Sequence, residues 1–265
     1  LMPIHIKKIM PTLTLGQDSS IQLSSKGTVE YKHHGVKSRA SVTMDGGNLS
    51  FPDMNLSLKG IAGSIDFNDL MVPESIPGQV LTIDRVQLNQ FEFDAAKARF
   101  SVEDGKSVNI ENLRFNWCNG LVSTESIRLP GQDNILSLIL YCDRLELSGL
   151  LKQMGAFHAE GEGTLSGRIP LVYSGGDISF EKGFLFSTPG KGGRVVIKDT
   201  TTLTAGIPMN TPEFVQLDLT REALKDFDYQ WAKLELNTFE DTLFMNIELD
   251  GKPAKIMPFE YQREI

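Results

Sequence analysis

Residues 161–190 decide the fold class of this chain, and they read GEGTLSGRIPLVYSGGDISFEKGFLFSTPG. Glycines stand where short segments end, and apolar residues alternate with polar residues between them. Alternation with a period of two is typical of β-strands with one buried face, and glycine punctuation is typical of tight turns. The stretch contains no metal-ligand set, phosphate-binding loop or nucleophile with its base. We therefore interpret it as a structural motif and expect the function to depend on shape.

The same stretch carries a family resemblance. The order Gly-x-Gly-x-Leu-x-Gly-x-x-Pro-Leu, a Gly-rich turn, Gly-x-Leu and Pro-Gly resembles the C-terminal domain of YdbH-like proteins. Ala223 to Tyr229 resembles that family's Ala-Leu-x-x-Phe-x-Tyr signature, and Leu243 to Gly251 with Pro253 resembles its closing strand and turn. Residues 160–265 carry the best of the resemblance, and its structural residues are Gly161, Gly163, Gly167, Pro170, Pro189 and Gly190.

The resemblance implies a periplasmic protein of the AsmA-like and TamB-like group, anchored in the inner membrane. Such proteins carry phospholipid between two membranes along a hydrophobic β-sheet groove. It further implies a non-enzymatic function without a cofactor, phospholipid acyl chains as the ligand, and a small outer-membrane lipoprotein that adds a strand at the C-terminal edge. The older family label "dicarboxylate transport" finds no support, because no arginine pair stands in an anion-binding context.

One pattern of apolar residues recurs between residues 50 and 120. Leu81 and Ile83 alternate, two spacer residues follow, and Val86 and Leu88 then alternate in the opposite parity. Because strand side chains alternate between two faces, a spacer pair must reverse the apolar face unless a bulge, bend or turn compensates. We therefore predict a long, bent sheet that keeps one face apolar. Similar shifts occur at Leu58 to Ile61, Leu88 to Phe91 and Ile110 to Leu113.

Turn and helix signals complete the fold prediction. Asp45-Gly46-Gly47, Asp104-Gly105 and Asn119-Gly120 are hairpin signals of an antiparallel meander. One short helix is predicted over Leu147 to Met154, with Ser148 as its cap and Gly155 as its stop. A second is predicted from a Thr220 cap through Ala223, Leu224 and Phe227, after an irregular connection over residues 200–212. The predicted class is mainly β: an elongated, curved antiparallel sheet, as a groove or incomplete barrel, with two short helices.

The length and charge of the chain limit its domain organisation and its possible partners. Residues 1–265 are expected to form a single elongated β domain. Leu1 is no initiator and residues 1–25 lack a long apolar run, so we expect a C-terminal segment of a longer protein. The 34 acidic and 26 basic residues give a net charge of −8, which argues against nucleic acid as a partner.

Reactive groups are sparse. The four histidines, two of them at His33 and His34, lack partners at metal-ligand spacing, so no metal site is predicted. The carboxylate pairs Glu160 with Glu162 and Glu240 with Asp241 are interpreted as solvated surface rather than as a glycosidase acid and base. Cys118 and Cys142 are expected as two buried thiols, with a disulfide as the alternative.

Three function classes remain open: a lipid-conducting segment, a structural or assembly scaffold of the cell envelope, and a carbohydrate-binding β-protein. The first requires a continuous apolar face without a strong polar trap. Strict alternation predicts that Leu243, Met245, Ile247 and Leu249 share one face, opposite Phe244, Asn246, Glu248 and Asp250. The predicted groove-lining candidates are Leu136, Leu138, Leu140, Phe184, Phe186, Leu234, Leu236, Leu243, Met245, Ile247 and Leu249.

Overall fold

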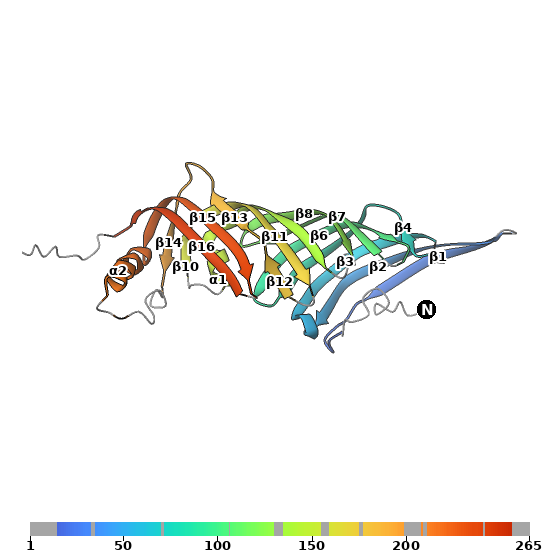
Figure 1. Ribbon diagram of the computed structural model, residues 1–265. Coiled ribbons are helices and arrows are strands. Elements are labelled where there is room, and N and C mark those ends of the chain that lie inside the picture. The colour runs from blue at the N-terminus through green and yellow to red at the C-terminus, as the bar shows by residue number, and fades with distance from the viewer. Residues whose placement is uncertain are drawn as a thin grey trace, which may run out of the picture.

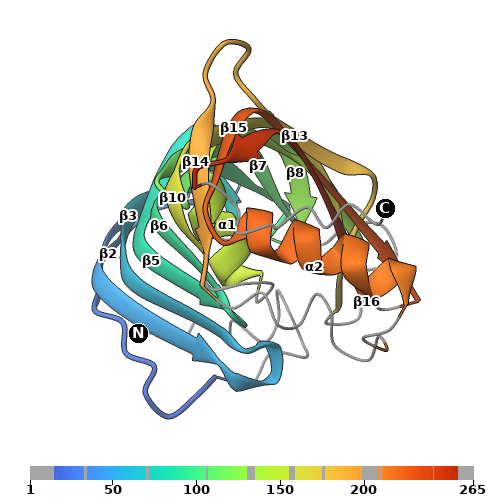
Figure 2. The ribbon, with the colours of Figure 1, turned by 90° about the vertical axis from the view of Figure 1, so that its left-hand side faces the viewer.

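The computed structural model describes residues 15–32, 35–69, 72–105, 107–129, 135–154, 159–174, 177–198, 208, 211–240 and 242–255. Within these residues, 16 strands form one antiparallel sheet that does not close into a barrel, together with two α-helices. The molecule is elongated (Figure 1), and the sheet arches so that one side stays open when seen end-on (Figure 2). The predicted fold class is therefore confirmed.

The first half of the sheet is a meander in which successive strands pair, with the two-residue β4 as an additional partner of β3. Its strands are β1 (Leu23–Lys32), β2 (Gly35–Phe51), β3 (Leu56–Asp69), β4 (Glu74–Ser75), β5 (Gln79–Leu88), β6 (Phe91–Glu103), β7 (Ser107–Trp117), β8 (Gly120–Leu129) and β9 (Leu136–Glu146). A 3-10 helix at Pro52–Met54 joins β2 to β3.

The second half departs from simple succession. After β9 the order is β11, β13, β15, β14 and β10, while β12 pairs with β11 and β16 pairs with β15. Because β16 pairs only with β15 among the described strands, it forms an edge of the sheet. These strands are β10 (Ala159–Glu162), β11 (Thr164–Ser174), β12 (Asp177–Phe180), β13 (Gly183–Ser187), β14 (Gly193–Ile197), β15 (Phe227–Phe239) and β16 (Thr242–Pro253).

Two of the three predicted hairpin turns are present. Asp104 and Gly105 lie between β6 and β7, with φ angles of 52° and 61°. The β7–β8 turn is centred one residue earlier than predicted, because Trp117 pairs with Gly120 around Cys118 and Asn119. The prediction for Asp45-Gly46-Gly47 was wrong. These residues lie inside β2, where the register shifts between Met44 and Gly47, so the glycines form a bulge instead of ending the strand.

The predicted parity reversals are confirmed. In β5, exposed Asp84 and Arg85 separate half-buried Ile83 from half-buried Val86, so both apolar residues stay on one face. Left-handed backbone conformations mark comparable positions in other strands. Their φ angles are 69° at Gly60, 51° at Ala95, 55° at Ser126 and 55° at Arg144.

The first predicted helix is confirmed as α1 (Leu147–Gln153), although Ser148 does not cap it. Instead, Ser148 Oγ donates to the Gly161 carbonyl at 3.4 Å. The predicted stop, Gly155, lies outside the described residues. The side chains of Leu147, Leu150 and Leu151 are buried, so this short helix is held by packing rather than by a cap.

The second helix lies earlier than predicted. α2 spans Pro212–Leu224, and Thr211 Oγ1 accepts a hydrogen bond from the Phe214 backbone N–H at 3.2 Å. Pro212 occupies the first turn, where its missing N–H costs nothing. The predicted cap, Thr220, lies inside the helix and donates to the Gln216 carbonyl, while Phe227 already belongs to β15. Of the predicted irregular connection over residues 200–212, the structure describes Pro208, Thr211 and Pro212, and Pro212 begins the helix; the remainder lies outside the described residues.

Two glycines of the fold-deciding stretch, Gly163 and Gly167, lie where a side chain has no room. A Cβ atom on Gly167 would lie 2.2 Å from the Phe184 carbonyl oxygen of the neighbouring strand. At Gly163, φ is +118° and a Cβ atom would lie 1.7 Å from Tyr229 Oη. Both positions therefore require close approach that a larger residue cannot match.

Candidate functional site

The face of the sheet that carries α1 is the inner face, and the opposite face is the outer face (Figure 2). Strand registers place one apolar row along the inner face from β2 to β16, interrupted by small or polar side chains at a few strands. Its larger members are Met44, Leu81, Leu113, Leu140, Ile169, Leu236 and Met245. We take this continuous apolar face as the candidate functional site. Among the described residues, no group of His, Cys, Asp or Glu side chains could hold a metal ion.

The inner face of β2, β3, β5, β6 and β7 forms the open end of the site. These strands make their main contacts with neighbours in the same sheet, whereas α1 makes its main contacts with β9 and β10. Ile83, Val86, Phe93 and Leu113 border the buried cluster, which includes Phe91 and Phe115 of β6 and β7. Most of the apolar side chains of the open end are half-buried, which is unusual for a contiguous apolar surface on a soluble protein. They include Leu56, Leu58, Ile65, Phe67, Leu81, Ile83, Val86, Phe93, Ile110 and Leu113.

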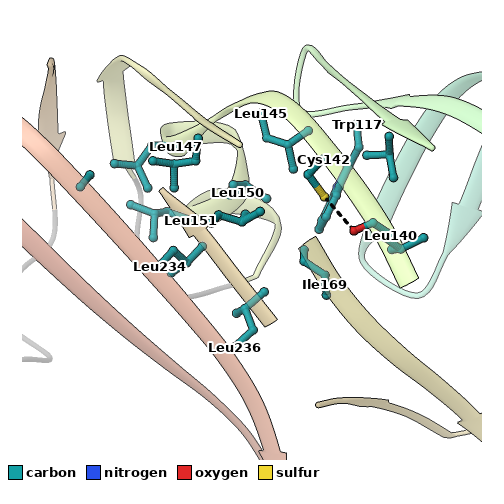
Figure 3. Packing of buried hydrophobic residues seen from close by; sticks show 14 of the residues in the cluster. Trp117, Leu140, Cys142, Leu145, Leu147, Leu150, Leu151, Ile169, Leu234 and Leu236 are labelled. Atoms are coloured by element: carbon teal, nitrogen blue, oxygen red, sulfur yellow. Dashed lines mark hydrogen bonds between the residues drawn. The ribbon is translucent and has the colours of Figure 1, made fainter. Parts of the chain in front are cut away.

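The other half of the inner face forms the closed end, where α1 fills the arch. Leu150 and Leu151 of α1 pack among side chains of β9, β11, β13 and β15 in one cluster (Figure 3). Leu234 and Leu236 of β15 have 0% of their surface exposed, as do Leu145 and Leu165. A close-packed interior of this kind leaves no room for a ligand.

Four aromatic rings lie at the boundary between the two ends. Phe93 contacts Phe115 edge-on at 5.1 Å between centroids, and Phe91 contacts Trp117 edge-on at 6.1 Å. Gln153 of α1 joins this cluster, because its Oε1 accepts from Trp117 Nε1 at 2.9 Å and from the Glu92 backbone N–H at 3.1 Å. The amide of Gln153 thus ties the end of α1 to β6 and β7.

The predicted lining residues fall into different places. The alternation predicted for β16 is confirmed, since Leu243, Met245, Ile247 and Leu249 are half-buried against the cluster and the intervening side chains are exposed. Leu136 and Leu138 are likewise half-buried on the inner face of β9. Leu140 is buried, and Leu234 and Leu236 belong to the closed end.

Phe184 and Phe186 lie on the outer face. Leu185 between them is fully buried, and Phe186 remains 39% exposed. Their rings stack on each other at 6.3 Å between centroids, and the Arg168 guanidinium lies 5.3 Å from the Phe184 centroid. The structure therefore separates these two residues from the other nine predicted lining residues.

The apolar residues of the open end were absent from the predicted lining set. Their signal was present, since the shifted alternation of Leu81 and Ile83 with Val86 and Leu88 predicted one apolar face. What the pattern lacked was the position of α1, whose main contacts are with β9 and β10 and not with β2 to β7.

Titratable groups add no reactive centre in the described part of the chain. Cys118 and Cys142 are free thiols; Cys142 is buried as expected, whereas Cys118 is half-buried. Burial raises the pKa of each from 9.0 to about 12, helped by Glu146 near Cys118 and by Cys118 near Cys142. Glu160 is exposed and forms an ion pair with Lys198 across β10 and β14. Neither thiolate chemistry nor a confined acid–base pair is built here.

One ion-pair network fastens the end that carries α2. Arg194 of β14 binds the Asp226 carboxylate through two bonds of 2.7 Å, and Lys255 approaches the same carboxylate at 3.4 Å. The hydrogen bond from Arg194 lowers the pKa of Asp226 below its ordinary value. Asp226 lies between α2 and β15, so the network joins this junction to β14.

None of the helices among the described residues has the length and apolar character needed to cross a membrane.

A family model matches residues 11–253, and its description reads "YdbH-like: Intermembrane phospholipid transport protein YdbH". No curated protein and no solved structure gives a significant match to this sequence.

Proposed function

Because this chain belongs to the YdbH-like family of intermembrane phospholipid transport proteins, we propose that the open end of its inner face is a hydrophobic groove for phospholipid acyl chains. The family is a lipid-transport family by its description, not an enzyme family. The observation that carries the proposal is the half-buried apolar face of β2 to β7, which lies outside the main contacts of α1. The chain would form part of a periplasmic bridge between the inner and outer membranes, and the full-length protein would be anchored in the inner membrane.

The energetic requirement is large. Burying a methylene group is worth about 0.8 kcal/mol, so a sixteen-carbon chain crossing water unprotected would face a cost of roughly 13 kcal/mol. A face that shields the chain along its path removes most of this cost. The ion pairs Arg85–Asp94, Arg99–Glu111 and Arg128–Glu103 lie between side chains of the opposite, outer face. The inner face therefore offers an acyl chain few polar interactions that would trap it.

The closed end limits the length of this groove. Leu140, Leu234 and Leu236 are packed with α1 in the cluster, so we assign them to the core that ends the groove. Leu136 and Leu138 and the four half-buried residues of β16 stay in the proposed lining, because their side chains retain exposed surface on the inner face. Phe184 and Phe186 are left out because they lie on the outer face.

The edge strand β16 is the proposed attachment point for a small outer-membrane lipoprotein. An unpaired edge presents backbone donors and acceptors to a strand from another chain. β16 is 12 residues long and alternates half-buried and exposed side chains, so an added strand would extend both faces of the sheet in register.

The test uses two substitutions in one strand. Ile83→Asp places a charge on the inner face of β5, and Val80→Asp places the same charge on its outer face, where Val80 is already exposed. In the full-length protein, Ile83→Asp should abolish phospholipid transfer and reduce crosslinking to photoactivatable acyl chains, whereas Val80→Asp should leave both unchanged. Melting curves of both variants serve as the control for folding.

Normal lipid flux with aspartate at Ile83 and at a second open-end position such as Leu113 would exclude conduction along this face. Crosslinking that is equal for both β5 variants would do the same. A folded protein without acyl crosslinks, needed only for envelope integrity, would favour the scaffold class.

A further inference from the structure

The outer face carries an exposed apolar patch that the groove does not explain. β9 is apolar on both faces, and its outer side chains Ile139 and Tyr141 are 38% and 52% exposed. Registers place Tyr141 beside Arg168 of β11, and Arg168 beside Phe184 of β13. The outer patch consists of Ile135, Ile139, Tyr141, Arg168, Phe184 and Phe186.

Arg168 at the centre of the outer patch has no carboxylate within ion-pair distance among the described residues. Its recorded partner is the ring of Phe184 at 5.3 Å. Two outer-face carboxylates on the strands of the patch or next to it are engaged elsewhere. Asp143 binds Arg144 at 3.3 Å, and Glu235, which pairs in register with Phe184, binds Lys233 at 2.6 Å. An exposed guanidinium without a carboxylate is suited to bind a phosphate through two parallel hydrogen bonds.

We propose that the outer patch docks on the surface of a phospholipid bilayer, with its apolar side chains at the headgroup–acyl boundary and Arg168 on a headgroup phosphate. Tyrosine, phenylalanine and isoleucine around an arginine are the combination that interfacial segments use. Contact with zwitterionic headgroups needs no positive protein charge, which agrees with the net charge of −8. The contact lies on the face opposite the groove and stands independently of lipid transport along it.

A second copy of the chain fits the patch less well. A two-fold contact through this face would bring two Arg168 side chains together, and the patch itself contains no carboxylate to neutralise them. A bilayer supplies the missing phosphate at any position, so it satisfies the arginine and the apolar side chains together.

The experiment is flotation of the 265-residue chain with vesicles of phosphatidylethanolamine and phosphatidylcholine. The wild-type chain should float with the vesicles. The double variant Tyr141→Ser/Phe186→Ser should lower the partition coefficient about tenfold, and Arg168→Glu about fivefold. Arg168→Lys should retain most of the binding, because it keeps the charge. Arg39→Glu and Val29→Ser are matched controls, since both residues are exposed and lie in the β1–β2 hairpin, outside the patch.

The Ile83→Asp variant distinguishes docking through the outer patch from lipid binding in the proposed groove. If the outer patch is what docks, this variant should float like the wild type. If Ile83→Asp stays at the bottom of the gradient while folded, the vesicles bind the inner face and the docking inference fails. It also fails if the wild-type chain does not float or if the patch variants float equally well. Sedimentation velocity provides the test for self-association. If the wild-type chain is a dimer and the double variant is a monomer, the patch binds a second copy and the docking inference is overturned.

Discussion

At the scale of single residues, the glycines of the fold-deciding stretch show how shape enters the sequence. Gly167→Val would drive a side chain into the Phe184 carbonyl oxygen, which a Cβ atom already approaches at 2.2 Å. We expect a loss of about 1 to 3 kcal/mol in the free energy of unfolding, measured by urea denaturation. Gly190→Ala is the comparison, because only the strain of its φ of +76° should matter where no atom lies within 4 Å. A Gly167→Val variant as stable as the parent would show that this glycine has no structural role.

The two thiols predict how stability changes in alkaline solution. Burial raises the pKa of Cys118 and Cys142 from 9.0 to about 12, so the unfolded chain loses these protons at lower pH than the folded chain. The contribution of the two protonated thiols to the free energy of unfolding is fully present below pH 9. It is lost as pH rises from 9 toward 12, at about 1.4 kcal/mol per pH unit for each thiol. Urea denaturation between pH 8 and pH 11 should show this slope.

The double variant Cys118→Ala/Cys142→Ala provides the control for the alkaline slope. Its stability should depend less on pH, although Tyr229 adds a slope of the same sign because burial raises its pKa too. Equal slopes in the variant and the parent would mean that the thiols do not titrate differently in the two states.

At the scale of elements, α1 decides which part of the inner face is core. Gln153→Ala would leave the Trp117 Nε1–H and the Glu92 N–H without their acceptor. Because the site is partly exposed and water can replace one bond, we expect a loss of about 1 kcal/mol and a red shift of Trp117 emission. Gln153→Glu keeps an acceptor and should preserve both signals, and Lys152→Ala serves as the exposed neighbour. An unchanged Trp117 spectrum in Gln153→Ala would argue against this anchor.

Some elements show where a sequence pattern is enough to predict the facing of a strand or the position of a helix, and others show where it is not. The facing of β16 was predictable because Leu243 to Leu249 alternate strictly and only one parity is apolar. Phe184-Leu185-Phe186 is apolar in both parities, so periodicity could not tell which residues face inward. The second helix was misplaced because Ala223, Leu224 and Phe227 fit helical spacing, while Thr211 and Pro212 carry the real start signal.

At the scale of the whole molecule, the open and closed ends predict two levels of stability in one sheet. Hydrogen exchange should be slowest in β11, β13 and β15, which carry the fully buried Leu165, Leu185 and Leu234, and faster in β2, β3 and β5. Mass spectrometry of deuterium uptake measures this difference strand by strand. Uniform protection along the sheet would contradict it. Sequence alone could predict the continuous apolar face, but not this division, which depends on α1 packing against the inner side of β9 and the strands that follow it.

The bulges have a consequence for how the length of such a chain can vary. Removing Arg144 from β9 would leave Cys142 and Leu145 separated by one residue, so both would still point inward. Removing a residue such as Ser137 would instead turn every following side chain of the strand to the other face. Single-residue deletions should therefore be tolerated at the bulges and rejected between them. The bulges act like the points in a coding sequence where the reading frame can be changed and restored.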